Sequence, residues 1–197
     1  MAVPRTKEIV IAIHKPGFVE KLFFFVSGIL MSSPFTLLTE ALSASFISIN
    51  LSVFYATILS VAVVAPLIEE FAKAYPLFYR HGETERSILL LGFLTGLGFG
   101  ILEFFLYVFI YSEPVLTRLP VVFFHATNTS ITAYGIAVKK PVKFYLLAFA
   151  LHSLINFAAI NYSGQIDVFF ILYMLALAIS YSLSWNLYKK SVERIVE

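Results

Sequence analysis

Six apolar runs fill most of this 197-residue chain and constrain its fold more than any other feature. Each approaches the roughly 20 residues that a helix needs to cross a bilayer. The gaps between them are too short for a separate soluble domain, so the sequence predicts an all-α polytopic bundle of about six transmembrane helices, in one membrane domain spanning residues 1–197. The runs are approximately Leu22–Leu38, Phe46–Tyr79, Ser87–Tyr111, Val115–Val138, Phe144–Tyr162 and Val168–Tyr188.

Composition narrows the classes of protein that fit. Hydrophobic residues make up 59% of the chain and charged residues only 13%, against about a quarter in a soluble domain. This excludes an ordinary soluble enzyme and a nucleic-acid binder built on a basic face. The chain has no Cys, which excludes disulfides and thiolate metal sites. Because Asp167 is the single aspartate, a paired-aspartate intramembrane protease is excluded as well.

The positions of Lys and Arg predict the orientation. Twelve of the 14 lie in residues 1–21, 80–86, 139–143 and 189–194, which share one side of the membrane if there are six crossings. Only Arg118 falls on the other side, and Lys73 lies inside the second run. Because cytoplasmic loops carry the excess of basic residues, we expect both termini to be cytoplasmic, including the N-terminal segment 1–21. The expected location is the plasma membrane of a prokaryote.

The second run is longer than one simple crossing requires. It contains Pro66 and Pro76, and proline interrupts helical hydrogen bonding because it has no N–H group. We therefore expect this run either to kink at its prolines or to extend beyond the hydrocarbon.

A few polar residues remain inside the predicted spans, and we expect the function to reside there. An ionisable group at mid-bilayer costs about 2.5–3.5 kcal/mol on insertion scales, so such groups are rarely kept without a use or a partner. At about 1.5 Å per residue they lie roughly 10–25 Å from the nearest cytoplasmic charge, in overlapping layers of four helices. They are Glu69, Glu70, Lys73, Glu103, His125, Asn128, His152 and Asn156.

Helical spacing groups the charged residues of this set. Glu69 and Glu70 precede Lys73 by four and three residues, so one carboxylate can pair with the ammonium while the other stays available for a proton, water or metal. Glu103 follows glycines at positions 92, 96 and 100 on nearly the same helical face. Because such glycines favour close helix packing, we expect Glu103 to point into the bundle.

The two histidines also have polar neighbours at helical spacing. His125 starts a stripe that continues through Asn128, which we expect to support the site. His152 and Asn156 are four residues apart on the next run. Two membrane histidines, each with polar neighbours, favour a functional role over a structural one.

These side chains suit hydrolysis by two alternative routes. In the first, Glu103, His125 and His152 bind Zn²⁺ and leave one position for water, with either member of the adjacent glutamate pair as the base. In the second, no metal takes part: Glu69 activates water while a histidine and Asn156 stabilise the oxyanion.

The order of these motifs resembles the PrsW family of intramembrane proteases. It is similar, more distantly, to the superfamily of CAAX prenyl endopeptidases and bacteriocin-immunity proteins (CPBP). The resemblance covers about residues 65–157, the predicted motif-bearing core, although Glu103 stands where the CPBP pattern has histidine. It rests on Glu69-Glu70-x-x-Lys73, Phe99-x-x-x-Glu103, His125 and His152-x-x-x-Asn156.

The resemblance implies an intramembrane peptidase, usually described as a metalloprotease, that hydrolyses a membrane-anchored protein or peptide. It implies that Glu69 and Glu70 are the catalytic pair, that His152 is essential, and that Glu103 and His125 complete the site. The alternatives are a proton-coupled transporter or channel, and a catalytically silent membrane chaperone or immunity protein of the same fold. The sequence does not specify an oligomeric state.

Overall fold

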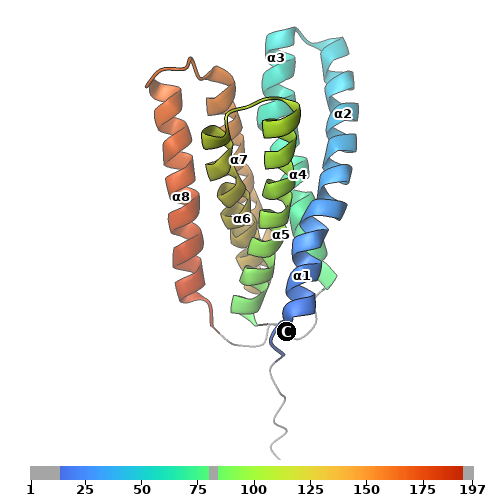
Figure 1. The fold of residues 1–197 in the computed structure, drawn as a ribbon, viewed down its shortest axis with the longest axis vertical. Coiled ribbons are helices and arrows are strands. Elements are labelled where there is room, and N and C mark those ends of the chain that lie inside the picture. The colour runs from blue at the N-terminus through green and yellow to red at the C-terminus, as the bar shows by residue number, and fades with distance from the viewer. Residues whose placement is uncertain (1–13, 80–83, 193–197) are drawn as a thin grey trace, which may run out of the picture.

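The computed structural model describes residues 14–79 and 84–192, and every element within these ranges is helical. The helices run roughly along the long axis of the molecule (Figure 1). The α-helices are α1 (Phe18–Ser27), α2 (Ser33–Asn50), α3 (Val53–Thr57), α4 (Ala65–Ala74), α5 (Glu85–Phe105), α6 (Val115–Ala137), α7 (Pro141–Asn161) and α8 (Val168–Lys190). Short π-helical segments are η1 (Gly28–Ser32), η2 (Ile58–Val64) and η4 (Leu106–Ile110), and η3 (Tyr75–Tyr79) is a 3₁₀ helix.

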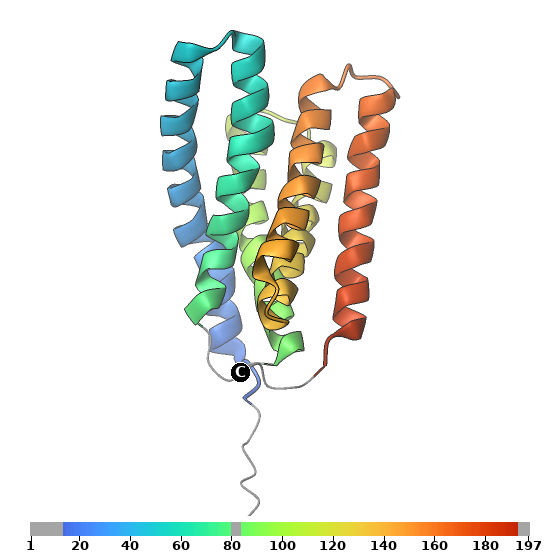
Figure 2. The ribbon, with the colours of Figure 1, turned by 180° about the vertical axis from the view of Figure 1, so that it is seen from behind.

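The boundary between the first two apolar runs differs from the prediction. Helix continues from Phe18 through α1, η1 and α2 to Asn50, so residues 46–50 belong to the first helical segment and not to the second. The chain reverses at Leu51 and Ser52, where Ser52 has an extended backbone (ψ 154°), and α3 lies beside α2 in both views (Figures 1 and 2). Hydropathy did not mark this turn because Leu51 is itself apolar. Of the predicted N-terminal segment 1–21, residues 1–13 lie outside the described residues.

The second helical segment changes geometry next to both of its prolines. The π-helical η2 ends at Val64 and Pro66 occupies the first turn of α4, while Pro76 lies in the 3₁₀ helix η3. Each proline removes one backbone donor, which is tolerated in a first turn but interrupts regular α-helix elsewhere. The segment from Val53 to Tyr79 is therefore irregular at the predicted places.

Close packing of α5 brings the site-bearing helices together. A Cβ added at Gly96 would lie 2.3 Å from the backbone oxygen of His125, and one at Gly100 would lie 2.8 Å from that of Val122, so both glycines touch the backbone of α6. On another face, a Cβ at Gly98 would lie 2.0 Å from the backbone oxygen of Phe25 in α1. The predicted packing role of the glycine stripe is confirmed, and α5 is held between α1 and α6.

Helix α8 closes the other side of the bundle through hydroxyl pairs. The hydroxyl groups of Thr127 and Ser180 form a hydrogen bond of 2.9 Å. Those of Ser130 and Ser184 form one of 2.6 Å. The single aspartate begins this helix: Asp167 accepts a hydrogen bond of 2.9 Å from the backbone N–H of Phe170. That bond, together with one from Ser163, holds the pKa of Asp167 below its usual value.

Four helical segments are long and apolar enough to cross a membrane, judged by length and composition over the described residues. They are Val53–Tyr79, Glu85–Ile110, Pro141–Asn161 and Val168–Lys190. The protein is therefore an all-helical integral membrane protein, as the sequence predicts.

Candidate active site

The two adjacent glutamates and Lys73 form a buried charge cluster on α4. Lys73 donates a hydrogen bond of 2.7 Å from Nζ to Oε1 of Glu70, and its Nζ lies 3.7 Å from Oε2 of Glu69. Both the Glu70 and Lys73 side chains are 0% exposed. Both glutamates thus lie near the Lys73 ammonium, as their helical spacing predicts, and Glu70 makes the shorter contact with it. Lys73 Nζ also lies 4.7 Å from the centroid of the Phe99 ring on α5.

His152 reaches this cluster from α7 and uses one ring nitrogen to hold Glu70. Its Nδ1 lies 2.8 Å from Oε1 of Glu70, and its Nε2 lies 3.6 Å from Oε2 of Glu69. Because an ionised carboxylate can only accept, Nδ1 is the donor in this contact. Glu70 therefore fixes the direction of the His152 ring, with Nε2 facing Glu69.

His125 on α6 is held from two sides. Lys73 Nζ lies 3.0 Å from its Nδ1, and its Nε2 contacts Oε2 of Glu103 on α5. The Glu103 side chain is 22% exposed, against 1% for His125. Glu103 thus points into the bundle, as its place on the glycine stripe predicts.

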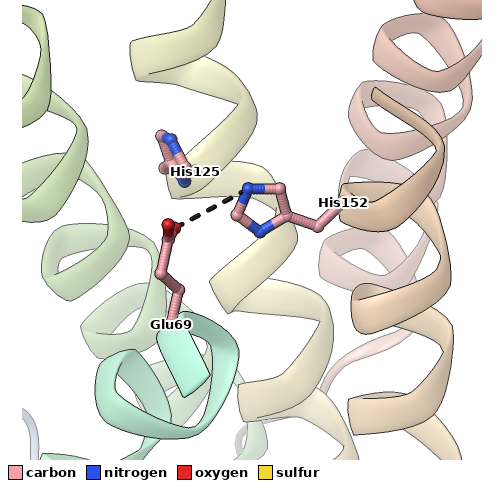
Figure 3. A group of neighbouring side chains, drawn as sticks. All are labelled: Glu69, His125 and His152. Carbon is pink, nitrogen blue, oxygen red and sulfur yellow. Dashed lines mark ion pairs between the residues drawn. The ribbon is translucent and has the colours of Figure 1, made fainter. Parts of the chain in front are cut away.

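Three of these residues form a group that could hold a metal ion. One ligand atom from each of Glu69, His125 and His152 lies within 4.8 Å of the other two, and all three residues are buried. They converge from α4, α6 and α7 (Figure 3). Two imidazole nitrogens and a carboxylate oxygen are a common protein ligand set of catalytic zinc. The residues therefore fit a metal, and the Glu70 carboxylate on Nδ1 of His152 is the outer partner that metal-bound histidines usually have.

The sequence-based metal set differs from this group in one member. Glu103 was predicted as a ligand beside His125 and His152, and Glu69 as a candidate base. In the structure Glu69 belongs to the compact group, and Glu103 contacts one of its members, His125.

The two predicted asparagines are turned toward backbone groups. Asn128 donates a hydrogen bond of 2.9 Å to the backbone oxygen of Ala148, one turn before His152 on α7. Asn156 donates one of 2.9 Å to the backbone oxygen of Val61 in η2. The first bond ties α6 to α7 next to the cluster. The bond from Asn156 to Val61 directs the Asn156 amide group away from the cluster. The structure therefore does not bring Asn156 together with the other site residues.

Arg118 and Tyr107, which the sequence analysis did not assign to the site, lie next to Glu103. The Arg118 guanidinium carbon is 3.3 Å from the centroid of the Tyr107 ring. Both side chains line a small pocket that also includes Glu103. The signals were present in the sequence: Arg118 is seven residues before His125 and Tyr107 four residues after Glu103, spacings that keep each pair on one helical face.

Comparison with protein families gave one match relevant to this geometry. The family model described as PrsW family intramembrane metalloprotease matches residues 21–183. No curated protein and no solved structure matched the chain.

Proposed function

Because the chain belongs to the PrsW family of intramembrane metalloproteases, we propose that it hydrolyses a peptide bond of a membrane-associated protein at the Glu69–His125–His152 cluster. The observation that carries this proposal is the buried convergence of one carboxylate and two imidazoles from three helices. The family also favours hydrolysis over the transporter or channel alternative.

In this proposal Glu69, His125 and His152 hold a divalent metal, with zinc as the metal their donor set suits best. A bound zinc ion lowers the pKa of water and polarises the substrate carbonyl. Glu70 orients His152 through Nδ1, and Lys73 fixes Glu70 with its bond of 2.7 Å. Neither Glu70 nor Lys73 is accessible to solvent, so we assign both to positioning.

We assign the proton transfers of the reaction to the carboxylate of Glu103. It lies outside the compact group of three, keeps 22% of its side chain exposed, and touches His125. A carboxylate at such an edge can accept a proton from water and return it to the leaving amine, as a general base and acid does. This assignment exchanges the roles that the sequence suggested for Glu69 and Glu103.

The arrangement in the membrane is part of the proposal. We infer six crossings with both termini in the cytoplasm of a prokaryote, because the basic residues gather at one end of such a bundle. The start of α1 and the end of α8 lie at the same end of the molecule (Figure 2), which is compatible with an even number of crossings.

The test is cleavage of a single-span reporter protein that the wild type cuts in reconstituted vesicles. Glu69→Gln and His152→Ala should each lower the cleavage rate by more than about 100-fold, because each removes a ligand of the group. Chelation should abolish wild-type cleavage, and added zinc should restore it.

Matched controls are Glu113→Gln and His14→Ala, which alter an exposed glutamate and an exposed histidine away from the cluster. Both should cleave at the wild-type rate. Wild-type cleavage by Glu69→Gln and His152→Ala would sink the proposed site. Cleavage that survives complete metal removal would instead point to the glutamate-only route.

A further inference from the structure

The second helical segment contains a backbone carbonyl that receives no hydrogen bond from the two backbone positions that helical geometry offers it. The oxygen of Val61 would accept from the N–H group four residues later in an α-helical turn, or five residues later in a π-helical turn. The N–H group four residues later belongs to Ala65, and it donates to Ser60 instead. The residue five positions later is Pro66, which has no N–H group. Val61 therefore needs a donor from elsewhere.

Asn156 on α7 supplies this donor. Its side-chain amide donates a hydrogen bond of 2.9 Å from Nδ2 to the backbone oxygen of Val61. Val61 has an exposed side chain and lies in the segment Val53–Tyr79, which is apolar enough to cross a membrane. Lipid offers a carbonyl no donor, so a carbonyl without a partner is strongly unfavourable there. The amide of Asn156 thus takes the place of the N–H group that proline lacks.

The carbonyl of Val61 lies where the hydrogen-bond register of the segment changes. A π-helical turn contains more residues than an α-helical turn, so η2 determines how α4 is rotated about its axis. Each residue occupies about 100° of a helical turn, and a change of one residue in η2 would rotate α4 by about that angle. Glu69 and Glu70 follow Pro66 by three and four residues, so their direction depends on the register of η2.

Helix α7 contacts the second segment on both sides of this register change. Asn156 bonds to Val61 within η2, and His152 bonds through Nδ1 to Oε1 of Glu70 on α4 at 2.8 Å. The two α7 residues are four positions apart and so lie on one face of the helix. The same face of α7 therefore binds both η2 and the carboxylate that η2 directs.

We propose that Asn156 is a positioning residue of the active site. By satisfying the carbonyl of Val61, it keeps the π-helical register of η2, and this register directs the two adjacent glutamates of α4 toward His152. Its importance for cleavage rests on the proposed function, whereas its effect on the helix register does not. Asn156 thus acts through the backbone of η2 and not on the oxyanion, the role that the sequence suggested for it.

The experiment measures the distance between α4 and α7 by pulsed electron paramagnetic resonance of the full chain, which has no native cysteine. Spin labels are attached in Phe71→Cys and Leu146→Cys, at exposed positions on α4 and α7. Asn156→Leu keeps the approximate size of the side chain but removes the donor. A change of one residue in the register would move a label on the surface of α4 by about 5 Å or more. We therefore expect this variant to lose the wild-type distance.

The proline provides a rescue variant. Pro66→Ala gives residue 66 an N–H group. Because the preceding N–H group already donates to the oxygen five residues earlier, the new one can donate to Val61 in the same way. Adding Pro66→Ala to Asn156→Leu should therefore restore the wild-type distance, whereas a loss of packing alone would not be reversed. If Asn156→Leu does not fold by itself, recovery of a folded protein on adding Pro66→Ala is the same rescue.

The matched control is Asn161→Leu. Asn161 also lies on α7, but it donates its hydrogen bond of 2.8 Å to the backbone oxygen of Phe157 in the same helix. Its loss should leave the distance between α4 and α7 unchanged. A second pair of labels, in Leu146→Cys and Leu175→Cys, joins exposed positions on α7 and α8. This pair should give the same distance in every variant, because neither label lies on the second segment.

Cleavage of the reporter protein links the register to the active site. Asn156→Leu should lower the cleavage rate about tenfold or more, because a displacement of about 1 Å near the chemistry can cost about 100-fold. Adding Pro66→Ala should recover most of the rate, and Asn161→Leu should cleave as the wild type does.

The outcomes separate this proposal from the proposed function. An unchanged distance in Asn156→Leu would overturn the proposal, whatever the protein cleaves. A shift that Pro66→Ala does not reverse would also overturn it, because Asn156 would then act through something other than the carbonyl of Val61. A shifted distance with wild-type cleavage would overturn the positioning role. A wild type that cleaves no reporter, with the expected shift and rescue in the variants, would overturn the proposed function and support the register role.

Discussion

Lys73 is the residue at which the buried charges of the site meet. Its ammonium contacts Glu70 at 2.7 Å, His125 at 3.0 Å and Glu69 at 3.7 Å, and it is inaccessible to solvent. The pairing with the two glutamates follows from the sequence, because residues three and four apart are neighbours on any helix. The contact with His125 does not, since it joins residues 52 apart in the chain and depends on how α4 packs against α6.

This cluster predicts a stability effect for Glu70. Glu70→Gln removes the short ion pair and leaves the Lys73 ammonium buried with weaker compensation, so it should lower the free energy of unfolding by about 3 kcal/mol. Glu70→Gln combined with Lys73→Met should recover part of this loss, because no ammonium is then buried without its closest partner, while Glu69 loses its contact of 3.7 Å with Lys73. The measurement is thermal or chemical unfolding in detergent, with Glu113→Gln as the exposed control.

Cleavage by the same double variant tests the positioning role independently of stability. It should remain low, because His152 has lost the charged partner of its Nδ1. A double variant that is stable and fully active would contradict the assignment of Glu70 to positioning.

The helix pair α5–α6 carries the strongest steric constraint in the fold. The glycine stripe was predictable from its spacing, and the structure confirms that it is a packing surface. Its partner was not predictable, because small residues permit close approach without specifying the helix that approaches. The turn at Leu51 and Ser52 was not predictable for a similar reason. Apolar residues indicate that a segment contacts lipid or protein, but they do not indicate where the chain reverses.

A single methyl group should therefore separate these helices. Gly96→Ala would place a Cβ 2.3 Å from the backbone oxygen of His125, and backbone cannot yield as a flexible side chain can. We expect a destabilisation of about 1–3 kcal/mol, as for other overpacked sites, together with loss of cleavage because His125 is displaced.

The matched control is Gly17→Ala, whose Cβ would have only an ordinary contact at 3.9 Å. Unfolding curves and cleavage rates of the two variants decide the matter. A Gly96→Ala protein as stable and active as Gly17→Ala would show that α5 and α6 are not held as closely as described.

At the scale of the whole molecule, the positions of the polar residues gave more information than their number. The sequence predicted an all-helical membrane protein and selected the four helices that carry the site, because charge is so scarce in this chain. It did not indicate that Glu69 groups with both histidines, since Glu69 and Glu103 lie on different helices and only the packing of these helices decides which carboxylate lies near both imidazoles. In the sequence, Arg118 stands out only as the single basic residue on its side of a six-crossing bundle.

The proposed six-crossing topology can be tested in a chain that has no native cysteine. The loops before α6 and between α7 and α8 lie at one end of the bundle, and the turn between α6 and α7 lies at the other (Figure 2). The exposed residues to replace are Glu113 and Gln165 in the first two loops and Lys140 in the turn, as Glu113→Cys, Gln165→Cys and Lys140→Cys. An impermeant thiol reagent should label the first two variants in intact cells and the third only after permeabilisation. Labelling of Lys140→Cys in intact cells would contradict cytoplasmic termini.

The central claim is that Glu69, His125 and His152 form a metal site, and X-ray absorption at the zinc edge of the purified wild-type protein tests it most directly. We predict one zinc ion per chain, with scattering from two imidazoles and a carboxylate and no sulfur, and loss of the bound zinc in His152→Ala. A protein that is fully active without metal, or zinc bound without imidazole scattering, would contradict the claim.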